Sequence, residues 1–265
     1  MSDDLRDLHR YLGTGAFGHV HEHHPEIAST NDRALEWARA GAPHGALVSA
    51  DLQLAGRGRR GRAWSSAPGE GLTFSVIVRP GALGLAEGFG ALALAVGVGL
   101  REALAPHLPG LALKWPNDLL HGGKKLAGIL CEGRWQAGRA EVLVIGVGVN
   151  VRQRALQPEL EGRATSLALA GAPPLGRAPL LAALLASIEA ALGDFARGGF
   201  AAIRPRYEPH SALHGREVMV DEPGGTQLRA RAEALDDDGA LLIRPLAGGP
   251  RRRVEAADVW LAPPT

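Results

Sequence analysis

Cysteine is nearly absent from this chain, since Cys131 is the single one among 265 residues. One cysteine excludes an internal disulfide. The first ten residues (MSDDLRDLHR) also lack the basic and apolar segments of a secretory signal peptide. Both absences predict a cytoplasmic protein.

The chain has neither an excess of one charge nor a long hydrophobic run. Lys and Arg number 29 against 28 for Asp and Glu, so there is no global positive field for nucleic acid. The most apolar window, 89–100 (FGALALAVGVGL), is too short and too rich in glycine to span a bilayer. We therefore expect no nucleic acid and no membrane among the partners. With 46% hydrophobic side chains, the chain can form one full domain plus a smaller one.

Positive charge is concentrated in one short stretch. Residues 56–62 (GRGRRGR) hold four arginines and three glycines, and Trp64 follows closely. Glycine leaves backbone N–H groups uncovered, and each guanidinium can bind a carboxylate or phosphate through paired hydrogen bonds. The stretch therefore predicts an anion site with an aromatic face beside it.

The spacing of Gly56, Gly58 and Gly61 matches the dinucleotide-binding fingerprint, which requires a helix after the glycines. Residues 65–71 (SSAPGEG) are instead turn formers, and 73–78 (TFSVIV) are typical of a strand. The Lys-Ser or Lys-Thr pair of a Walker loop is also missing. A solvated basic arm that touches nucleic acid is the remaining alternative.

The first 28 residues are too few for a DNA-binding domain with its own core, and three glycines would interrupt a helix there. We expect an irregular lead-in or a first strand. Four histidines at near-alternating positions could bind a metal from one strand face, although solvated histidines are the commoner case. They are His19, His21, His23 and His24.

Residues 29–32 (STND) begin a helical pattern that Gly41 and Pro43 end, with Ser29 in the position of an N-cap. A helix N-terminus lined with hydroxyl and amide groups could also bind a neutral polar ligand. A long buried helix is predicted at 85–104. Residues 111–118 (LALKWPND) are typical of a strand that ends in a polar turn, which places Asn117 and Asp118 at the strand end. Further strands are predicted at 46–54, 73–78, 125–132 and 141–151, with a Gly-Gly hairpin at 121–124.

The second half predicts a short helix at 165–170 and a strong one at 180–195. A domain boundary is expected at 204–214, which contains Pro205 and Pro209. Short strands separated by turn residues then suggest a small β-barrel of about fifty residues. These strands are predicted at 217–220, 227–235, 240–245 and 251–254.

Three polar clusters share one chemical theme. They are the arginine loop with Gln53 and Trp64, the pair of Lys114 with the Asn117-Asp118 turn, and Lys125 before a strand that carries Gly128. Together they offer cations for phosphate, oxygen ligands for Mg²⁺, an aromatic face for a purine and neutral groups for a second ligand.

The order of these motifs resembles the biotin protein ligases. The matching segments run from about residue 25 to the end: STN at 29–31, Gln53, GRGRRGRAW at 56–64, KWPNDLL at 114–120, KLAGIL at 125–130 and IGVGVN at 145–150. The resemblance implies an α+β, class II synthetase-like catalytic domain, with a mixed and mostly antiparallel sheet, followed by an SH3-like β-barrel. The implied divisions are a lead-in at 1–24, the catalytic domain at 25–210 and the barrel at 211–265.

The resemblance also implies a two-step reaction in which biotin and ATP form biotinyl-5′-AMP and a lysine of a biotin carboxyl carrier domain then takes the biotin. The implied cofactors are ATP and Mg²⁺, and the implied state is a monomer or homodimer. The implied biotin contacts are Ser29, Thr30, Asn31, Gln53, Arg57, Gly58, Arg59, Lys125 and Gly128. The implied ATP contacts are Arg57, Arg62, Trp64, Lys114, Asn117 and Asn150. The implied catalytic residues are Lys125, Arg57 and Arg59, with Asp118 a candidate Mg²⁺ ligand.

Two departures and one competitor accompany this resemblance. The short lead-in leaves no room for the winged helix of relatives that are also repressors, and Leu54 stands where a second glutamine is common. A lipoate ligase or octanoyltransferase has the same fold, but octanoyl transfer typically uses a nucleophilic cysteine. Cys131 lies inside an apolar strand, where a buried inert thiol is expected.

Overall fold

A computed structural model of the chain describes residues 4–85, 89–136, 139–221, 226–255 and 257–262. Its larger part is a seven-stranded sheet in the order β1-β2-β3-β7-β6-β5-β4. Only the β1–β2 pair is parallel among these described strands, so the sheet is mixed and mostly antiparallel, as expected. The strands are β1 (His21–Ile27), β2 (Leu47–Gln53), β3 (Gly71–Val78), β4 (Leu111–Lys114), β5 (Asp118–His121), β6 (Lys124–Gln136) and β7 (Arg139–Asn150).

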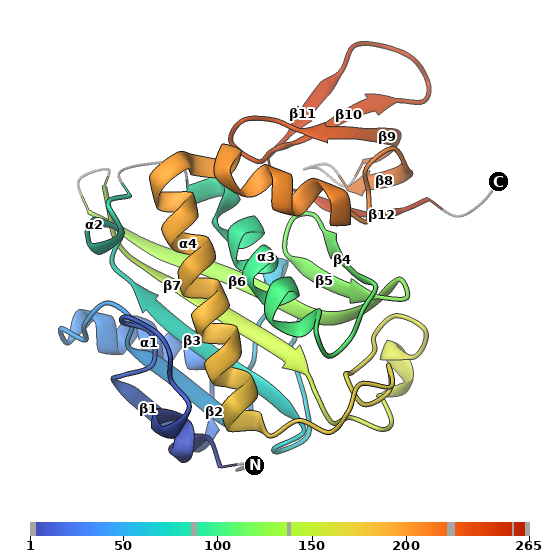
Figure 1. The fold of residues 1–265 in the computed structure, drawn as a ribbon. Coiled ribbons are helices and arrows are strands. Elements are labelled where there is room, and N and C mark those ends of the chain that lie inside the picture. Colours follow the sequence, from blue (N-terminus) through green and yellow to red (C-terminus); the bar gives the residue numbers. More distant parts are fainter. Residues whose placement is uncertain (1–3, 86–88, 137–138, 222–225, 256, 263–265) are drawn as a thin grey trace.

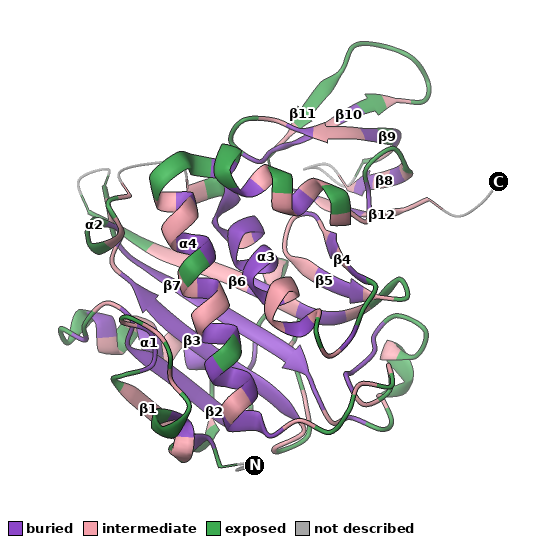
Figure 2. Cartoon of the chain, in the orientation of Figure 1, coloured by how far each residue is buried: buried purple, intermediate pink, exposed green. Residues whose placement is uncertain are grey.

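Both faces of the central strands are buried, because side chains alternate between the faces of a strand and helices cover each face. Val76 and Ile145 point into the main core, under α3 (Leu92–Leu104) and α4 (Arg177–Tyr207). Their neighbours Ile77 and Val144 pack with α1 (Thr30–Arg39). Figure 2 shows the central strands as buried along most of their length. The sheet is thus the middle layer of three (Figure 1).

The two long helices lie side by side over the sheet and approach each other closely (Figure 1). A Cβ atom at Gly99 of α3 would lie 2.8 Å from the Cα of Ile188 in α4, so the contact requires glycine. One stretch, Arg177–His210, is long and apolar enough to cross a membrane by length and composition. Its most apolar window is 56% buried inside the fold, which is the behaviour of a core helix.

A second, five-stranded antiparallel sheet follows α4, in the order β11-β10-β9-β8-β12. Its strands are β8 (Glu217–Asp221), β9 (Gln227–Leu235), β10 (Leu241–Pro245), β11 (Arg252–Val254) and β12 (Asp258–Leu261). Four of them match predicted strands, and the sequence pattern missed β12. The unit lies at one end of the main sheet (Figure 1), and the indole N–H of Trp115 donates to the Gly239 carbonyl across the junction at 3.0 Å.

Three element predictions need correction. The helix predicted at 85–104 begins only at Leu92, after a 3₁₀ turn at Phe89–Ala91. Residues 165–170 form turns in place of a helix, and the N–H groups of Thr165 and Leu167 tie the start of this segment to the carbonyls of Lys125 and Asn150 on the sheet. The helix predicted at 180–195 runs from Arg177 to Tyr207, with a kink at Gly199 (φ 60°, ψ −156°) that divides it in two, and Pro205 lies in the second part.

The N-terminal segment is packed against the domain. Leu5, Leu8 and Phe17 are buried in the main core. The carboxylate of Glu189 in α4 accepts hydrogen bonds from the backbone N–H groups of residues 15, 16 and 17 at 2.6, 2.7 and 3.0 Å. Strand β1 then begins at His21, within the range that we expected to be a lead-in.

The histidines of this segment do not form a metal site. The rings of His21 and His23 share the buried hydroxyl of Ser49 at 2.8 and 3.0 Å, and His23 also bonds to Asp51 at 3.3 Å. Within the ranges that the structure describes, no group of three or more His, Cys, Asp or Glu side chains could hold a metal ion. The metal hypothesis for these histidines was wrong, because a serine and an aspartate bind the two rings.

Candidate active site

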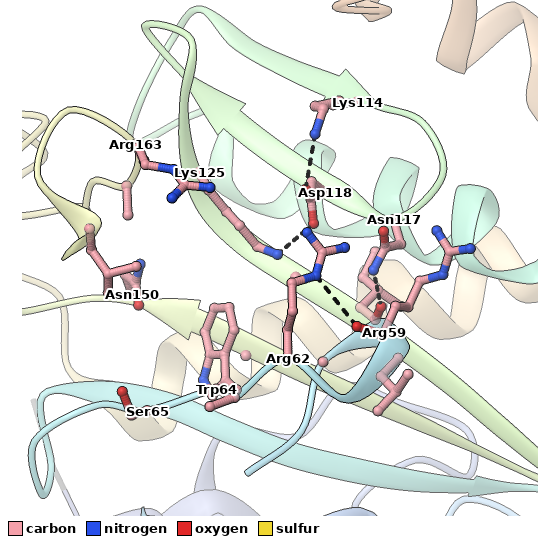
Figure 3. A pocket seen from close by; sticks show the side chains of 18 of the residues that line it. Arg59, Arg62, Trp64, Ser65, Lys114, Asn117, Asp118, Lys125, Asn150 and Arg163 are labelled. Carbon is pink, nitrogen blue, oxygen red and sulfur yellow. Dashed lines mark hydrogen bonds and ion pairs between the residues drawn. The ribbon is translucent and has the colours of Figure 1, made fainter. Parts of the chain in front are cut away.

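One cavity of about 780 Å³ opens where α1, the arginine loop and strands β4 to β7 meet. Every residue that the resemblance assigned to biotin, ATP, catalysis or metal lines this cavity. They are Ser29, Thr30, Asn31, Gln53, Arg57, Gly58, Arg59, Arg62, Trp64, Lys114, Asn117, Asp118, Lys125, Gly128 and Asn150. Figure 3 shows the charged part of the site, with side chains from separate elements converging on one space.

One end of the cavity consists of neutral polar side chains, of which Ser29, Thr30 and Asn31 are almost fully buried and Gln53 is half-buried. Ser29 caps α1 and accepts the N–H of Asp32 at 3.3 Å, and Thr30 and Asn31 form its first turn. Gln53, at the end of β2, accepts the backbone N–H and the hydroxyl of Thr30 at 2.8 and 2.9 Å. Because an N–H can only donate, the Gln53 oxygen faces Thr30 and its NH₂ group points away from it.

The network continues through Ser75, which the sequence analysis missed. Ser75 is fully buried at the centre of β3, and its hydroxyl lies 2.6 Å from Asn31 Oδ1 and 2.8 Å from Thr30 Oγ1. On its other side Asn31 donates through Nδ2 to a carboxylate oxygen of Glu132 at 2.6 Å. A serine within the apolar run TFSVIV was the available signal, because a buried hydroxyl needs a partner.

Two glycines on one face of β7 make room for the site. A Cβ atom at Gly146 would lie 2.2 Å from Asn31 Oδ1, and one at Gly148 would lie 2.2 Å from Trp64 Cε2. Real Cβ atoms do not approach other atoms so closely. The IGVGVN motif therefore accommodates Asn31 at its first glycine and the Trp64 ring at its second.

The arginine loop closes as a small hairpin. Arg57 and Ala63 form an isolated β-bridge, and the N–H of Trp64 donates to the Gly56 carbonyl at 2.9 Å. Arg60, at the tip, has the left-handed φ of 54° that is uncommon for residues other than glycine. Arg57 and Arg62 leave this hairpin toward different parts of the molecule, α1 and β12.

Three of these guanidinium groups have carboxylate partners. Arg57 donates to both oxygens of Asp32 at 2.6 Å, and these bonds raise its pKa above the ordinary arginine value. Arg62 lies 2.6 Å and Arg60 3.5 Å from oxygens of Asp258, at the start of β12. The loop is thus tied to α1 on one side and to the C-terminal sheet on the other.

Arg59 differs from the other three. Its guanidinium group forms no ion pair with the described residues. The one hydrogen bond of that group to them goes to the Ala257 carbonyl, at 3.5 Å. Burial lowers its pKa from the ordinary arginine value. A carboxylate or phosphate that entered the cavity would give Arg59 the anionic partner that this part of the chain does not supply.

Two lysines flank Asp118, which begins β5. Lys125 Nζ lies 2.6 Å and Lys114 Nζ 3.6 Å from its carboxylate oxygens (Figure 3). Burial lowers the pKa of Lys114. Lys125 Nζ also lies 5.5 Å from the centroid of the Trp64 ring, so the aromatic face and the cations share one end of the cavity.

Asp118, the expected Mg²⁺ ligand, lies between two cations. Its two oxygens face ammonium groups, and among the described residues no cluster of acidic or histidine side chains surrounds it. Magnesium in nucleotide sites usually takes one or two carboxylates and completes its shell with phosphate oxygens and water. The role of Asp118 as a Mg²⁺ ligand stays a prediction.

Asn117 and Asn150 are held through their amide nitrogens. Asn117 donates to the Ile129 carbonyl at 2.7 Å, and Asn150 donates to the Thr165 carbonyl at 2.9 Å. The outer wall comes from 157–164, a segment that the motifs did not include. It is fixed beside Lys125, whose N–H donates to the Arg163 carbonyl at 2.9 Å.

Cys131 plays no part in this geometry. It is partly buried on β6, outside the residues that line the cavity, and burial raises the pKa of its thiol to about 12. A neutral thiol is a poor nucleophile. The site thus lacks the reactive cysteine that an octanoyltransferase would use.

Two family models match the sequence. The Biotin/lipoate A/B protein ligase family matches residues 24–150, and the Biotin protein ligase C terminal domain matches residues 213–261. The biotin--[acetyl-CoA-carboxylase] ligase of Mycobacterium tuberculosis is 34% identical over 260 residues, which cover 96% of this chain and 93% of that protein. The chain belongs to the biotin protein ligases.

Two further proteins support membership in the biotin protein ligases. The bifunctional ligase/repressor BirA of Bacillus subtilis is 35% identical over 254 residues, covering 94% of this chain and 76% of that one. The structure of the biotin protein ligase from Aquifex aeolicus in complex with biotin and ATP has a TM-score of 0.77 and 28% identity. The match covers 92% of this chain and 100% of the Aquifex aeolicus chain. The expected family and fold class are confirmed.

Proposed function

We propose that this chain attaches biotin to a lysine of a biotin carboxyl carrier domain, in two steps and at the one cavity described above. In the first step the biotin carboxylate attacks the α-phosphorus of ATP, which forms biotinyl-5′-AMP and releases pyrophosphate. In the second step the lysine amine attacks the biotinyl carbonyl, forms an amide, and releases AMP. The observation that carries this proposal is that a neutral polar pocket and a cationic, aromatic pocket are two ends of the same cavity.

The neutral end binds the ureido ring of biotin. An uncharged ring with N–H donors and a carbonyl acceptor suits hydroxyl and amide partners, and Thr30, Asn31 and Gln53 provide them. Ser29 lines the same end, and Gly128 leaves space near Lys125 and Trp64. The arginine loop, with Gly58 in it, then spans the distance from the biotin end to the nucleotide end.

The cationic end binds ATP. The Trp64 ring covers the purine, and Asn117 and Asn150 contribute amide groups at the same end. Arg59, Arg62, Lys114 and Lys125 meet the phosphates, with Arg57 at the carboxylate junction. Magnesium bound to the triphosphate would neutralise part of its charge, and Asp118 is the residue that would contact it.

Lys125 lowers the barrier of the first step. Two anionic groups must approach, and negative charge grows on the phosphate oxygens in the transition state. A fixed ammonium group stabilises that charge more than it stabilises the ground state. Asp118 holds Lys125 Nζ at 2.6 Å, which keeps the ammonium group at the cavity wall.

The test is incubation of the full chain with labelled biotin, ATP, Mg²⁺ and a carrier domain from a biotin-dependent carboxylase. Label on the carrier lysine, with pyrophosphate release that requires biotin, is the expected result. Transfer of lipoate or octanoate with no biotin transfer would overturn the proposal. We further propose that the protein acts in the cytoplasm as a monomer or homodimer and binds no nucleic acid, which sedimentation and a DNA-binding assay would test.

A further inference from the structure

We propose that Glu132 is a positioning residue that couples the biotin pocket to the arginine loop, an inference that rests on the proposed function. Glu132 lies on β6 beside Cys131 and is not among the residues that line the cavity. It acts through two residues that do line it: one carboxylate oxygen lies 2.6 Å from Asn31 Nδ2, and the other lies 3.5 Å from an Arg57 guanidinium nitrogen.

The bond from Asn31 to Glu132 helps to decide which way the Asn31 amide faces. A carboxylate only accepts hydrogen bonds, so Asn31 must turn its NH₂ group toward Glu132 and its oxygen toward the Ser75 hydroxyl. The two bonds, each 2.6 Å, fix the amide from opposite sides in a place where it is 5% exposed. Without the carboxylate, the Asn31 NH₂ group keeps the longer bond to the Leu130 carbonyl, at 3.4 Å, and loses the short, charge-assisted one that holds it in place.

The other carboxylate oxygen of Glu132 contacts Arg57 in the arginine loop. Arg57 is bonded to both oxygens of Asp32 at 2.6 Å, and Glu132 adds a second carboxylate at 3.5 Å. Both hydrogen bonding and the charge of Glu132 contribute to the raised pKa of Arg57, after the larger effect of Asp32. Glu132 therefore joins the first turn of α1, through Asn31, to the start of the arginine loop, through Arg57.

A change at Glu132 should weaken the binding of biotin and not that of ATP. Such a change alters the groups that meet biotin and leaves Trp64, Lys114 and Lys125 in place, because within the described ranges none of these three forms a hydrogen bond or ion pair with Glu132. A residue with a merely structural role would lower stability and the affinity for both ligands together.

The experiment compares Glu132→Leu, Glu132→Gln and Ser75→Ala in the full chain, with wild-type protein as reference. Steady-state pyrophosphate release gives KM for biotin and for ATP, and calorimetry gives the affinity for biotin alone. Glu132→Leu is expected to raise KM for biotin by about 10-fold or more, as for loss of a charge-assisted hydrogen bond, with KM for ATP within about twofold. Glu132→Gln keeps an oxygen for Asn31 and should fall between wild type and Glu132→Leu, and Ser75→Ala should also raise KM for biotin selectively.

Glu141→Gln is the matched control. Glu141 lies on the neighbouring strand β7, is exposed, and pairs with Arg134 at 3.2 Å away from the cavity, so both KM values should stay at wild type. If Glu132→Leu fails to fold, Glu132→Gln and Ser75→Ala decide the matter. Equal changes in both KM values, or an unchanged KM for biotin in folded variants, would overturn this inference and leave the proposed function in place. A wild-type chain that binds no biotin would overturn the proposed function and the inference with it.

Discussion

The two ends of the cavity are built in different ways. The biotin end consists of neutral groups on α1, β2 and β3, and the hydrogen bonds at its centre join Thr30, Asn31 and Ser75, which are at most 5% exposed. The nucleotide end is lined by an exposed loop whose guanidinium groups form ion pairs with Asp32 and Asp258. Buried hydrogen bonds fix the shape of a pocket before its ligand arrives, whereas exposed ion pairs contribute little stability and an incoming phosphate can replace them.

This difference predicts that the first chemical step depends most strongly on the cationic end. Lys125→Ala should reduce pyrophosphate release by about 10²- to 10³-fold, the usual effect of losing one preorganised donor. Supplying biotinyl-5′-AMP should restore much of the carrier labelling, because the mixed anhydride is already activated. Equal losses in the two assays would instead make Lys125 a structural or carrier-side residue, and attention would move to Arg59 and Lys114.

A pair of glycine substitutions should separate the two ends. Gly146→Ala places a methyl group against Asn31 and should weaken biotin binding, whereas Gly148→Ala places one against Trp64 and should weaken ATP binding. Overpacking of this kind costs about 1–3 kcal/mol, or about 5- to 150-fold in affinity. Calorimetry with each ligand separately measures the split. If both substitutions weakened both ligands to the same extent, the two ends would not be independent.

The histidines of β1 lie outside both ends and should affect stability alone. Burial, with a smaller contribution from His23, lowers the pKa of His21 from 6.5 to about 4. Below pH 6.5, His21 therefore binds a proton more readily in the unfolded chain than in the folded one. The contribution of His21 to the free energy of unfolding is complete above pH 6.5 and is lost as the pH falls toward about 4.

Urea unfolding at a series of pH values measures this contribution. His21→Gln should flatten the loss of stability between pH 6.5 and about 4, whereas the exposed His19→Gln should not. Identical pH profiles for His21→Gln and wild type would assign the acid sensitivity to other groups.

The smallest effect is expected at the ion pairs of the loop. Asp258→Asn removes the partner of Arg60 and Arg62, and exposed pairs of this kind contribute about 0–1 kcal/mol to stability. We expect an unchanged melting temperature but faster tryptic cleavage of the ligand-free loop. Biotin plus ATP should slow cleavage in both proteins, because an anion stabilises the repelling arginines. Equal cutting rates with and without ligands would show that the loop is already fixed.

The sequence alone was sufficient to select residues that the fold brings together. All the residues taken from GRGRRGR, KWPND and KLAGIL line one cavity. Local patterns also located most strands, because alternation and turn residues act over short distances. They failed where distant contacts decide the structure, as at residues 165–170, whose N–H groups bond to Lys125 and Asn150.

Tertiary structure decided which of these residues act on one another. Sequence spacing contains no information about contacts between α1, β3 and β6, so Ser75 and Glu132 could not be recognised as partners of Asn31. In the same way, only the fold shows that two lysines lie beside the carboxylate of Asp118. Residue type fixes what a side chain can bind, but folding fixes its neighbours, and in a cavity lined by many elements the neighbours determine its role.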